Sequence, residues 1–387
     1  MNVPKLRFKE FTDEWKNIKL QKIISIYKEQ STIENQYPML TSSKQGLVLQ
    51  KDYYSNNARI TNRSNIGYNV LPYGYITYRN RSDTGFFTFN INLKLKKGLI
   101  SYFYPVFSLK NSNEYFLVNL LNTKYQFKMY AISEGTSQKV LSIANLKNLK
   151  VLYPSLEEQN KIANFLTTVD KKITNLENTI TSLENQKKGL LQQIFSQKLR
   201  FKDKNGNNYP NWEKKKLEDI SNITMGQSPD SDFVNTEKIG TPFLQGNAEF
   251  TNKYPIEKYW CTKPQKIANP TDILLSVRAP VGAINIANKK FCIGRGLSAI
   301  SFNCNKLFGK YNLKFNLFQL IKKSQGSTFS SINKKDISEV ILFIPCLEEQ
   351  TKIADFLSAF DRKLENQKAQ LEHWKQIKKG LLQQMFV

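Results

Sequence analysis

The chain contains one long motif twice. Leu-Glu-Glu-Gln, followed after one residue by Lys-Ile-Ala, occupies 156–163 and returns 191 residues later at 347–354. Lys-Lys-Gly-Leu-Leu-Gln-Gln occupies 187–193 and returns at the same offset at 378–384. A motif that recurs at a fixed offset indicates a structural unit that is used twice. We therefore expect a pseudo-symmetric molecule with two related surfaces that face one extended partner.

Both copies lie in segments that have the spacing of a coiled coil. Apolar residues recur at alternating steps of four and three from Ile162 to Ile194 and from Ile353 to Met385, which predicts two long amphipathic helices. A lysine falls at the same interface position in each copy, at Lys187 and at Lys378, and the second copy also has Gln367 at an interface position. The apolar interface positions that we expect are Ile162, Leu166, Val169, Ile173, Leu176, Ile180, Leu183, Ile353, Leu357, Phe360, Leu364, Leu371 and Trp374.

Each helix has a recognisable start. Pro154 cannot continue a helix backwards, Ser155 is suited to cap the helix, and Glu158 stands three residues further on, which together predict a capping box. In the second copy Cys346 replaces the serine. We expect that cap to be weaker by up to about 1 kcal/mol.

The two helices are expected to pair with each other. One amphipathic helix of this length cannot cover its own apolar stripe. The segment 198–202, after the first helix, resembles the segment 5–9 near the N-terminus, and Trp212 corresponds to Trp15. The chain closes on itself if the helices are antiparallel and carry one globular domain at each end. The alternative is that both helices pack into one compact core beside merged domains.

The segments between the helices predict domains rich in strands. The runs 75–78 and 272–277 are short, apolar and flanked by proline or glycine turns. The expected fold class is α+β, with two strand-rich domains joined by two long helices that form an antiparallel coiled coil with a pseudo-twofold repeat. We expect the first domain at 1–154, the first helix at 155–197, the second domain at 198–345 and the second helix at 346–387.

The charge of the chain favours a polyanion as its partner. It has 57 lysines and arginines against 32 aspartates and glutamates, a net charge of +25, and nucleic acid is the leading candidate. A compositional bias towards lysine on solvated faces is the alternative explanation. The four cysteines include no Cys-x-x-Cys pair, so neither a zinc site nor a disulfide framework is expected. Without a secretory leader or a membrane span, we expect a reduced, cytoplasmic protein.

Arginines cluster in the first domain. Four of them lie within the 23 residues from Arg59 to Arg81, interleaved with tyrosines. Arginine can donate two hydrogen bonds to guanine O6 and N7 or to phosphate, so we expect the turn 78–81 to read DNA. For each single residue the alternative is contact with phosphate or no contact with DNA. The expected DNA-binding residues are Arg59, Arg63, Tyr78, Arg79, Asn80 and Arg81 in the first domain, and Gln245, Asn247, Arg278 and Arg295 in the second.

No catalytic motif is found in the sequence. It lacks the Asn/Asp-Pro-Pro-Tyr/Phe sequence of base methyltransferases, a Walker A loop and a complete nuclease motif. The single histidine, His373, lies beside an interface position of the second helix, where packing or a place on the helix surface explains it better than catalysis. We expect a binding protein and not an enzyme.

The order of these parts resembles the DNA specificity subunit of type I restriction-modification systems. The resemblance rests on the two copies of Pro-x-Leu-Glu-Glu-Gln-x-Lys-Ile-Ala and Lys-Lys-Gly-Leu-Leu-Gln-Gln, each following a dissimilar domain, and it covers essentially the whole chain. It implies that each domain is a target recognition domain that reads one half of a bipartite, asymmetric DNA site, and that the paired helices set the gap between the halves.

The same resemblance implies partners. Two modification subunits, which bind S-adenosylmethionine and methylate adenine, would dock on the helices, and restriction subunits would join them to cut DNA. This chain would hold no cofactor or metal of its own. Two other classes of function stay open: a general nucleic-acid-binding coiled-coil adaptor, which would bind DNA without sequence preference, and a self-contained enzyme.

Overall fold

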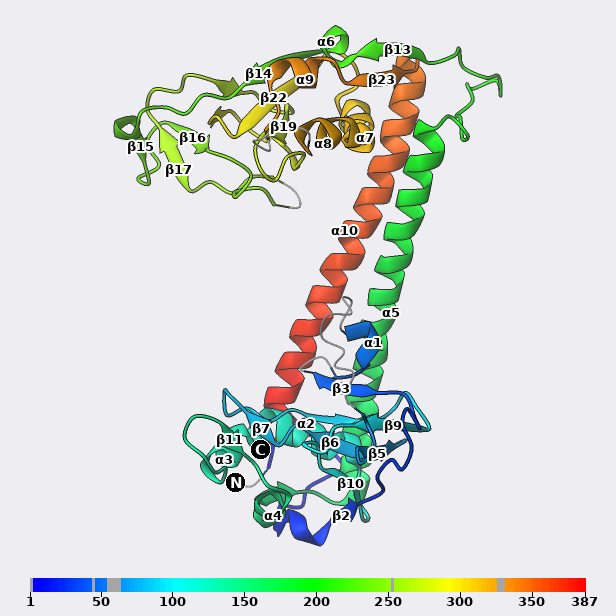
Figure 1. Cartoon of the computed structure of the whole chain (residues 1–387), viewed down its shortest axis with the longest axis vertical. Helices are drawn as coiled ribbons and strands as arrows, with labels where there is room; N and C mark the ends of the chain where they lie inside the picture. Colours follow the sequence, from blue (N-terminus) through cyan, green and yellow to red (C-terminus); the bar gives the residue numbers. More distant parts are fainter. Residues whose placement is uncertain (1–2, 44–45, 54–63, 252–253, 326–330) are drawn as a thin grey trace. The chain divides into compact units, whose positions relative to one another are not determined.

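The computed structural model describes residues 3–43, 46–53, 64–251, 254–325 and 331–387. The chain divides into two units, Met1–Glu177 with Ala369–Val387, and Asn178–Lys368. Each unit holds one strand-rich domain and parts of two long helices, α5 (Leu156–Phe195) and α10 (Leu347–Gln384) (Figure 1). The two helices therefore belong to both units, and each unit is described by itself.

The first domain is built on a four-stranded antiparallel sheet in the order β2-β10-β6-β8. These strands are β2 (Ile24–Tyr27), β10 (Val106–Leu109), β6 (Ile76–Tyr78) and β8 (Phe89–Ile91). Two-stranded sheets surround it: β1 (Lys16–Lys19) with β12 (Lys150–Tyr153), β3 (Leu40–Ser43) with β4 (Gly46–Leu49), β5 (Asn69–Pro72) with β9 (Lys97–Ile100), and β7 (Arg81–Ser82) with β11 (Lys139–Val140). The helices are η1 (Leu20–Lys22), α1 (Gln50–Tyr53), α2 (Glu114–Lys124), α3 (Gln126–Ala131) and α4 (Ile143–Asn148).

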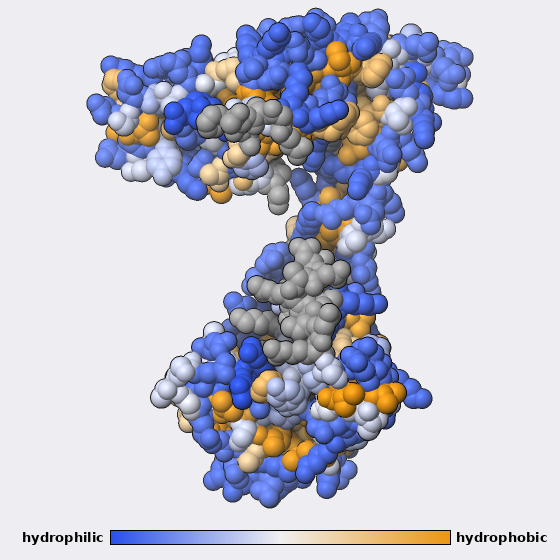
Figure 2. All heavy atoms as spheres, in the orientation of Figure 1, coloured by the Kyte–Doolittle hydropathy of each residue, from blue (hydrophilic) through white to orange (hydrophobic). Residues whose placement is uncertain are grey.

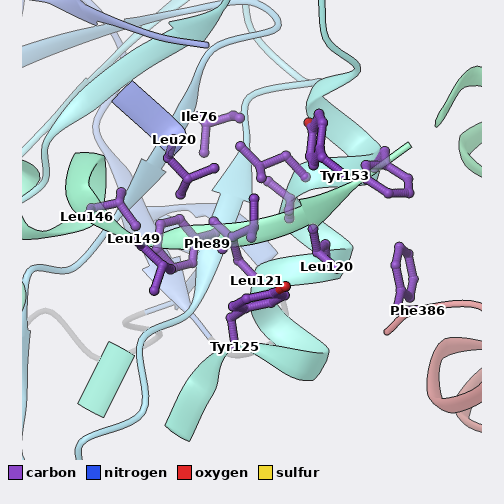
Figure 3. Packing of buried hydrophobic residues seen from close by; sticks show 14 of the residues in the cluster. Leu20, Ile76, Phe89, Leu120, Leu121, Tyr125, Leu146, Leu149, Tyr153 and Phe386 are labelled. Atoms are coloured by element: carbon purple, nitrogen blue, oxygen red, sulfur yellow. The ribbon is translucent and has the colours of Figure 1, made fainter. Parts of the chain in front are cut away.

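The core of the first domain includes side chains from both ends of the chain. Figure 3 shows residues of the sheet and of α2, such as Phe89 and Leu121, in one cluster, with Phe386 at its margin. Phe386 follows α10, and its ring centroid lies 5.3 Å from that of Phe116 in α2. Because a fully buried aromatic side chain contributes several kcal/mol to stability, this contact holds the end of α10 on the first domain.

The second domain repeats the same sheet. Its four strands have the order β14-β22-β19-β20, and all neighbours are antiparallel. They are β14 (Ser221–Met225), β22 (Leu297–Phe302), β19 (Ile273–Ser276) and β20 (Ile284–Ile286), and the outer pair β13 (Glu213–Lys216) with β23 (Ile341–Ile344) corresponds to β1 with β12. The helices are α6 (Leu217–Ile220), η3 (Ser231–Phe233), α7 (Lys306–Asn316), α8 (Phe318–Gln325) and α9 (Lys334–Ser338).

The two domains differ in the strands that are inserted after β2 or β14, and after β8 or β20. In the second domain a five-stranded sheet in the order β15-β17-β16-β21-β18 stands where the first domain has the small sheets β3–β4 and β5–β9. Its strands are β15 (Val234–Asn235), β17 (Tyr259–Cys261), β16 (Thr241–Leu244), β21 (Phe291–Ile293) and β18 (Ile267–Ala268). The scaffold is therefore shared and the inserted layer is specific to each domain.

The long helices run in opposite directions within each unit. Along α5, as the residue number rises, each successive ion pair is made with a residue of lower number in α10. These pairs are Asp170–Lys378 at 2.5 Å and Glu177–Lys375 at 2.8 Å in the first unit, and Glu184–Lys368 at 2.6 Å and Lys187–Asp361 in the second. The antiparallel helical pair, the two mixed domains and the pseudo-twofold repeat confirm the fold class that the sequence predicts.

The spacing of the helices also agrees with their burial. In α5 the apolar interface positions are buried, apart from the half-buried Ile173, and those of α10 after Leu357 are half-buried. The first positions of each helix have a second role, because Ile162 and Leu166 belong to the core of the first domain, and Ile353 and Leu357 to that of the second. The start of each helix is thus part of a domain core.

The capping box expected at the first helix is only half formed. The amide of Glu158 donates to the Ser155 hydroxyl at 3.3 Å. The carboxylate of Glu158, however, is buried, accepts two hydrogen bonds of 2.8 Å from Arg7, and accepts one of 3.2 Å from the Trp15 indole. The expectation of a reciprocal box is therefore wrong, because this carboxylate ties the N-terminal segment to the helix.

The second copy makes the same contacts. The carboxylate of Glu349 accepts two hydrogen bonds of 2.8 Å from Arg200 and one of 3.0 Å from Trp212. The glutamine that follows is also shared: the side-chain oxygens of Gln159 and Gln350 accept the backbone amides that precede α2 and α7, at 3.0 and 3.1 Å. Leu-Glu-Glu-Gln is therefore a joint between helix, N-terminal segment and domain.

Candidate nucleic-acid interface

The most informative site lies where the third strand of each four-stranded sheet ends. In the first domain the amide of Asn80 donates to the Phe103 carbonyl at 3.1 Å, and the carbonyl of Asn80 accepts the Leu141 amide at 2.9 Å. In the second domain Val277 makes the matching bonds to Gly296 and Ile332, both at 3.0 Å. These bonds make Asn80 and Val277 equivalent, so the residues that follow them, Arg81 and Arg278, are equivalent too.

The two arginines have the same backbone partners and the same exposure. Arg81 pairs with Val140 in the β7–β11 ladder, and Arg278 forms a β-bridge with Ser331. Val140 and Ser331 are themselves 191 residues apart, which is the offset of the long motif. Both arginine side chains are exposed. The repeat therefore extends from the helices into the domains and presents one arginine at the same place in each.

A glycine follows each arginine after three residues. Gly85 has a φ of +77° and Gly282 a φ of +94°, in a region that residues with a side chain rarely adopt. A Cβ on Gly85 would lie 2.3 Å from a ring atom of Tyr130. Sequence reasoning missed this Arg-x-x-x-Gly turn. Its two copies are 197 residues apart, whereas the long motif repeats at an offset of 191.

The first domain forms a small cavity in front of this turn. It has a volume of about 240 Å³ and is lined by Arg79, Arg81, Asp83, the exposed Phe86 and hydroxyl side chains. Those hydroxyl residues are Ser42, Ser43, Ser82, Thr84 and Thr88. The guanidinium carbon of Arg81 lies 4.3 Å from the centroid of the Phe103 ring, a cation–π contact that restrains the side chain and leaves its donors open to a ligand.

Not every residue expected in the first domain is at the surface. Tyr78 is fully buried, its hydroxyl donates to the Leu141 carbonyl at 2.9 Å, and burial raises its pKa. Tyr78 is therefore a core residue below the turn, and we withdraw it as a DNA contact. Asn80 is half-buried and lies between the two exposed arginines. Arg59 and Arg63 lie outside the described residues.

In the second domain the expected residues converge on one glycine-lined surface. The Ser228 hydroxyl contacts both polar atoms of the Gln245 side chain, at 3.0 and 3.1 Å, and accepts the Arg295 amide at 3.3 Å. The backbone between them is closely packed, because a Cβ on Gly226 would lie 2.2 Å from the carbonyl oxygen of Gly294. Ser228 was missed by sequence reasoning, since no local pattern marks it.

Backbone bonds connect this surface to the second arginine turn. The carbonyl of Gly296 accepts the Val277 amide at 3.0 Å, and the Gly296 amide donates to the Gln245 carbonyl at 3.3 Å. Arg278, Gln245 and Arg295 therefore belong to neighbouring segments, and their side chains are exposed. Asn247 is half-buried in the turn after Gln245. These groups offer guanidinium and amide donors and an amide acceptor, the chemistry that suits base edges in a groove of DNA.

Within the described ranges, no group of three or more His, Cys, Asp and Glu side chains is arranged to hold a metal ion. In the same ranges, none of the helices has the length and apolar character needed to cross a bilayer.

Fold and interface together define a two-domain protein with a repeated scaffold and two different polar surfaces. Residues 12–185 and 209–373 match the family of the type I restriction modification DNA specificity domain. A relative from Methanocaldococcus jannaschii, the putative type I restriction enzyme MjaX specificity subunit, is 38% identical over 287 residues, which cover 70% of this chain and 67% of the relative. The chain belongs to the family of type I restriction-modification DNA specificity subunits.

Solved structures show the same fold. The type I restriction-modification S subunit from M. genitalium aligns over 100% of this chain and 99% of its own, with a TM-score of 0.63 and 17% identity. A chain from a study of complex assembly and conformational transition of the type I R-M system covers 95% of this chain and 96% of its own, with a TM-score of 0.57 and 24% identity. As a specificity subunit, the chain recognises DNA sequence and is not the catalytic component.

Proposed function

We propose that the domain at 1–154 and the domain at 198–345 each read one half of a bipartite, asymmetric DNA site, and that Arg81 and Arg278 are equivalent reading residues. The observation that carries this proposal is their identical backbone setting on two domains whose inserted layers differ. The same exposed arginine on two otherwise different surfaces suits a DNA contact that both half-sites need.

The neighbours of each arginine supply the difference between the half-sites. In the first domain Arg79, Asn80 and several hydroxyl groups surround Arg81. In the second, Gln245, Asn247 and Arg295 accompany Arg278. Arginine suits guanine, and Asn or Gln suits adenine. Two scaffolds with different neighbours would therefore read different bases, which makes the whole site asymmetric.

We further propose that the helical segments 155–197 and 346–387 set the gap between the half-sites and dock two modification subunits, which carry S-adenosylmethionine. Restriction subunits would join this complex in the cytoplasm. The support for docking lies in apolar side chains that are exposed in both copies. Figure 2 shows that apolar residues are exposed in places on a largely hydrophilic surface. The repeated exposed pairs near the helix starts are Leu6 with Leu199, Leu156 with Leu347, and Phe165 with Phe356.

A repeated apolar surface suits a partner that is present in two copies. Exposed apolar side chains do not attract phosphate, and contiguous ones mark protein interaction sites. Phe8 packs edge-on to Phe165 at 5.8 Å between ring centroids, and Phe201 packs in the same way on Phe356 at 5.6 Å. The same small aromatic cluster is thus presented twice, as two identical modification subunits would require.

The test is a map of methylated adenines in cells that express this chain with its modification subunits. We expect Arg81→Ala to relax base preference in one half-site and Arg278→Ala to relax it in the other, each at a cost of about 1–3 kcal/mol. Lys94→Ala, an exposed cation between β8 and β9, is the control and should leave the map unchanged. An equal loss at all sequences would reduce either arginine to a phosphate contact, and methylation without sequence preference would favour the adaptor function.

A further inference from the structure

A tyrosine from each domain reaches an ion pair between the long helices. In the first unit Asp170 of α5 contacts Lys378 of α10 at 2.5 Å, and the hydroxyl of Tyr115 in α2 donates to the same carboxylate. In the second unit Asp361 of α10 contacts Lys187 of α5 and accepts a hydrogen bond of 2.7 Å from Tyr311 in α7. Each carboxylate therefore joins three elements: both long helices and one domain helix.

The aspartates and lysines of this joint recur at the offset of the long motif, but the tyrosines do not. Asp170 and Asp361 are 191 residues apart, as are Lys187 and Lys378. The tyrosines are the second residue of α2 and the sixth residue of α7.

The two domain helices themselves start at equivalent places. Asn113 and Asn305 cap them by the same hydrogen bond, and both are held by the equivalent glutamines of the long motif. The tyrosines therefore stand one helical turn apart on one face. Both domains therefore keep a tyrosine–aspartate contact, although the tyrosine stands at a different position of the helix in each. A duplicated sequence alone does not explain a contact that is kept in this way.

The ion pairs occupy positions where apolar residues would stabilise the helices more. The lysines fall in the coiled-coil interface, and the exposed fractions of Lys187 and Asp361 are only 17% and 26%. Replacing a partly buried ion pair by apolar residues is often neutral or stabilising, whereas a polar interface position specifies alignment at some cost in stability. A lysine kept at both places therefore indicates a role in geometry.

The tyrosine hydroxyls remain donors over the working pH range. Burial and the hydrogen bond to the aspartate raise the pKa of both Tyr115 and Tyr311. Two other ion pairs between the helices, Glu177–Lys375 and Glu184–Lys368, have side chains that are 46–49% exposed.

We propose that Tyr115–Asp170–Lys378 and Tyr311–Asp361–Lys187 are positioning residues that fix the angle of each recognition domain on the helical pair, and so determine which gap length the protein accepts. This inference rests on the proposed function. It assigns selectivity for the gap to two tyrosine–carboxylate contacts in addition to the length of the helices.

The experiment uses this chain in complex with its modification subunits and a series of DNA duplexes. Each duplex carries both half-sites, separated by the preferred gap or by one base pair more or fewer. In Tyr115→Phe and Tyr311→Phe the ring stays and only the hydroxyl is lost. Because each variant loses a hydrogen bond to a charged group, we expect the ratio of affinities between preferred and altered gaps to fall about tenfold. Asp170→Asn and Asp361→Asn should lower the same ratio.

Controls separate positioning from stability and from the proposed function. Glu184→Gln removes an exposed ion pair of the same helices and should leave the ratio unchanged. A tyrosine variant that binds all gaps more weakly by the same factor, or that keeps the wild-type ratio, overturns the inference. A wild-type complex that accepts every gap equally would instead contradict the proposed function itself.

Discussion

The second glutamate of each Leu-Glu-Glu-Gln motif is among the most buried charged side chains in the described residues. Glu158 is 2% exposed and Glu349 is fully buried, while the preceding Glu157 and Glu348 are exposed. Each buried carboxylate accepts a bidentate arginine contact, and this hydrogen bonding raises the pKa of Arg7 and Arg200. Two adjacent glutamates of one motif thus have opposite environments, which only their packing determines.

We predict that Glu349→Ala will lower the free energy of unfolding by about 3–5 kcal/mol, because it leaves the guanidinium of Arg200 without its partner. Glu348→Ala is the matched control in the same motif and should change it by less than about 0.5 kcal/mol. Urea denaturation of the full chain, followed by circular dichroism, measures both. Equal effects of the two substitutions would show that the buried carboxylate does not hold the N-terminal segment.

At the scale of elements, the long helices are stabilised chiefly by their apolar interface. Leu176 and Leu183 are 4% and 5% exposed, whereas the ion pairs beside them, Glu177–Lys375 and Glu184–Lys368, are about half exposed. Exposed ion pairs contribute about 0–1 kcal/mol, and a buried leucine contributes several times more. The apolar interface residues therefore supply most of the stability of the helical pair.

Leu183→Ala should accordingly destabilise the chain by about 2–5 kcal/mol through the cavity that it leaves. Its neighbour in sequence provides the comparison, because Glu184→Ala removes one exposed ion pair and should cost at most about 1 kcal/mol. Thermal unfolding followed by calorimetry distinguishes the two values. A larger loss from Glu184→Ala would mean that charge, and not apolar burial, stabilises the helical pair.

At the scale of the whole molecule, the protein has a net charge of +25 but few residues that are suited to reading bases. The charge acts on any DNA sequence, whereas discrimination rests on the arginine turns and their neighbours. Affinity and specificity are therefore separate properties of this protein.

We predict that the logarithm of the DNA association constant will fall linearly with the logarithm of salt concentration, with a slope of about −0.9 for each phosphate contact. The ratio between cognate and altered half-sites should change far less, because the salt-dependent part is common to both sequences. Fluorescence anisotropy at salt concentrations from about 50 to about 200 mM, where this effect is large, tests both statements. An affinity that does not respond to salt would contradict a phosphate-based attraction.

Much of the architecture could be predicted from the sequence. The spacing of apolar residues from Ile162 to Ile194 determines a helix and its buried face, because that periodicity is local. The second copy of the same pattern supplies the partner helix, and the resemblance of 198–202 to 5–9 predicted that the two run antiparallel. The turn at 78–81 could also be proposed from the sequence, because its arginines are recognisable by residue type alone.

Only the tertiary structure decided which side chains face solvent and which segments meet. Tyr78 and Arg79 are neighbours in the chain, yet one is buried and the other is exposed. The equivalence of Arg81 and Arg278 depends on backbone pairing between distant segments. The contact of Ser228 with Gln245 and the two tyrosine joints depend on side chains that meet only in the folded chain. The physical reason is that periodicity is set by neighbours in the chain, whereas burial and hydrogen bonding across the fold depend on residues that become neighbours only when the core forms.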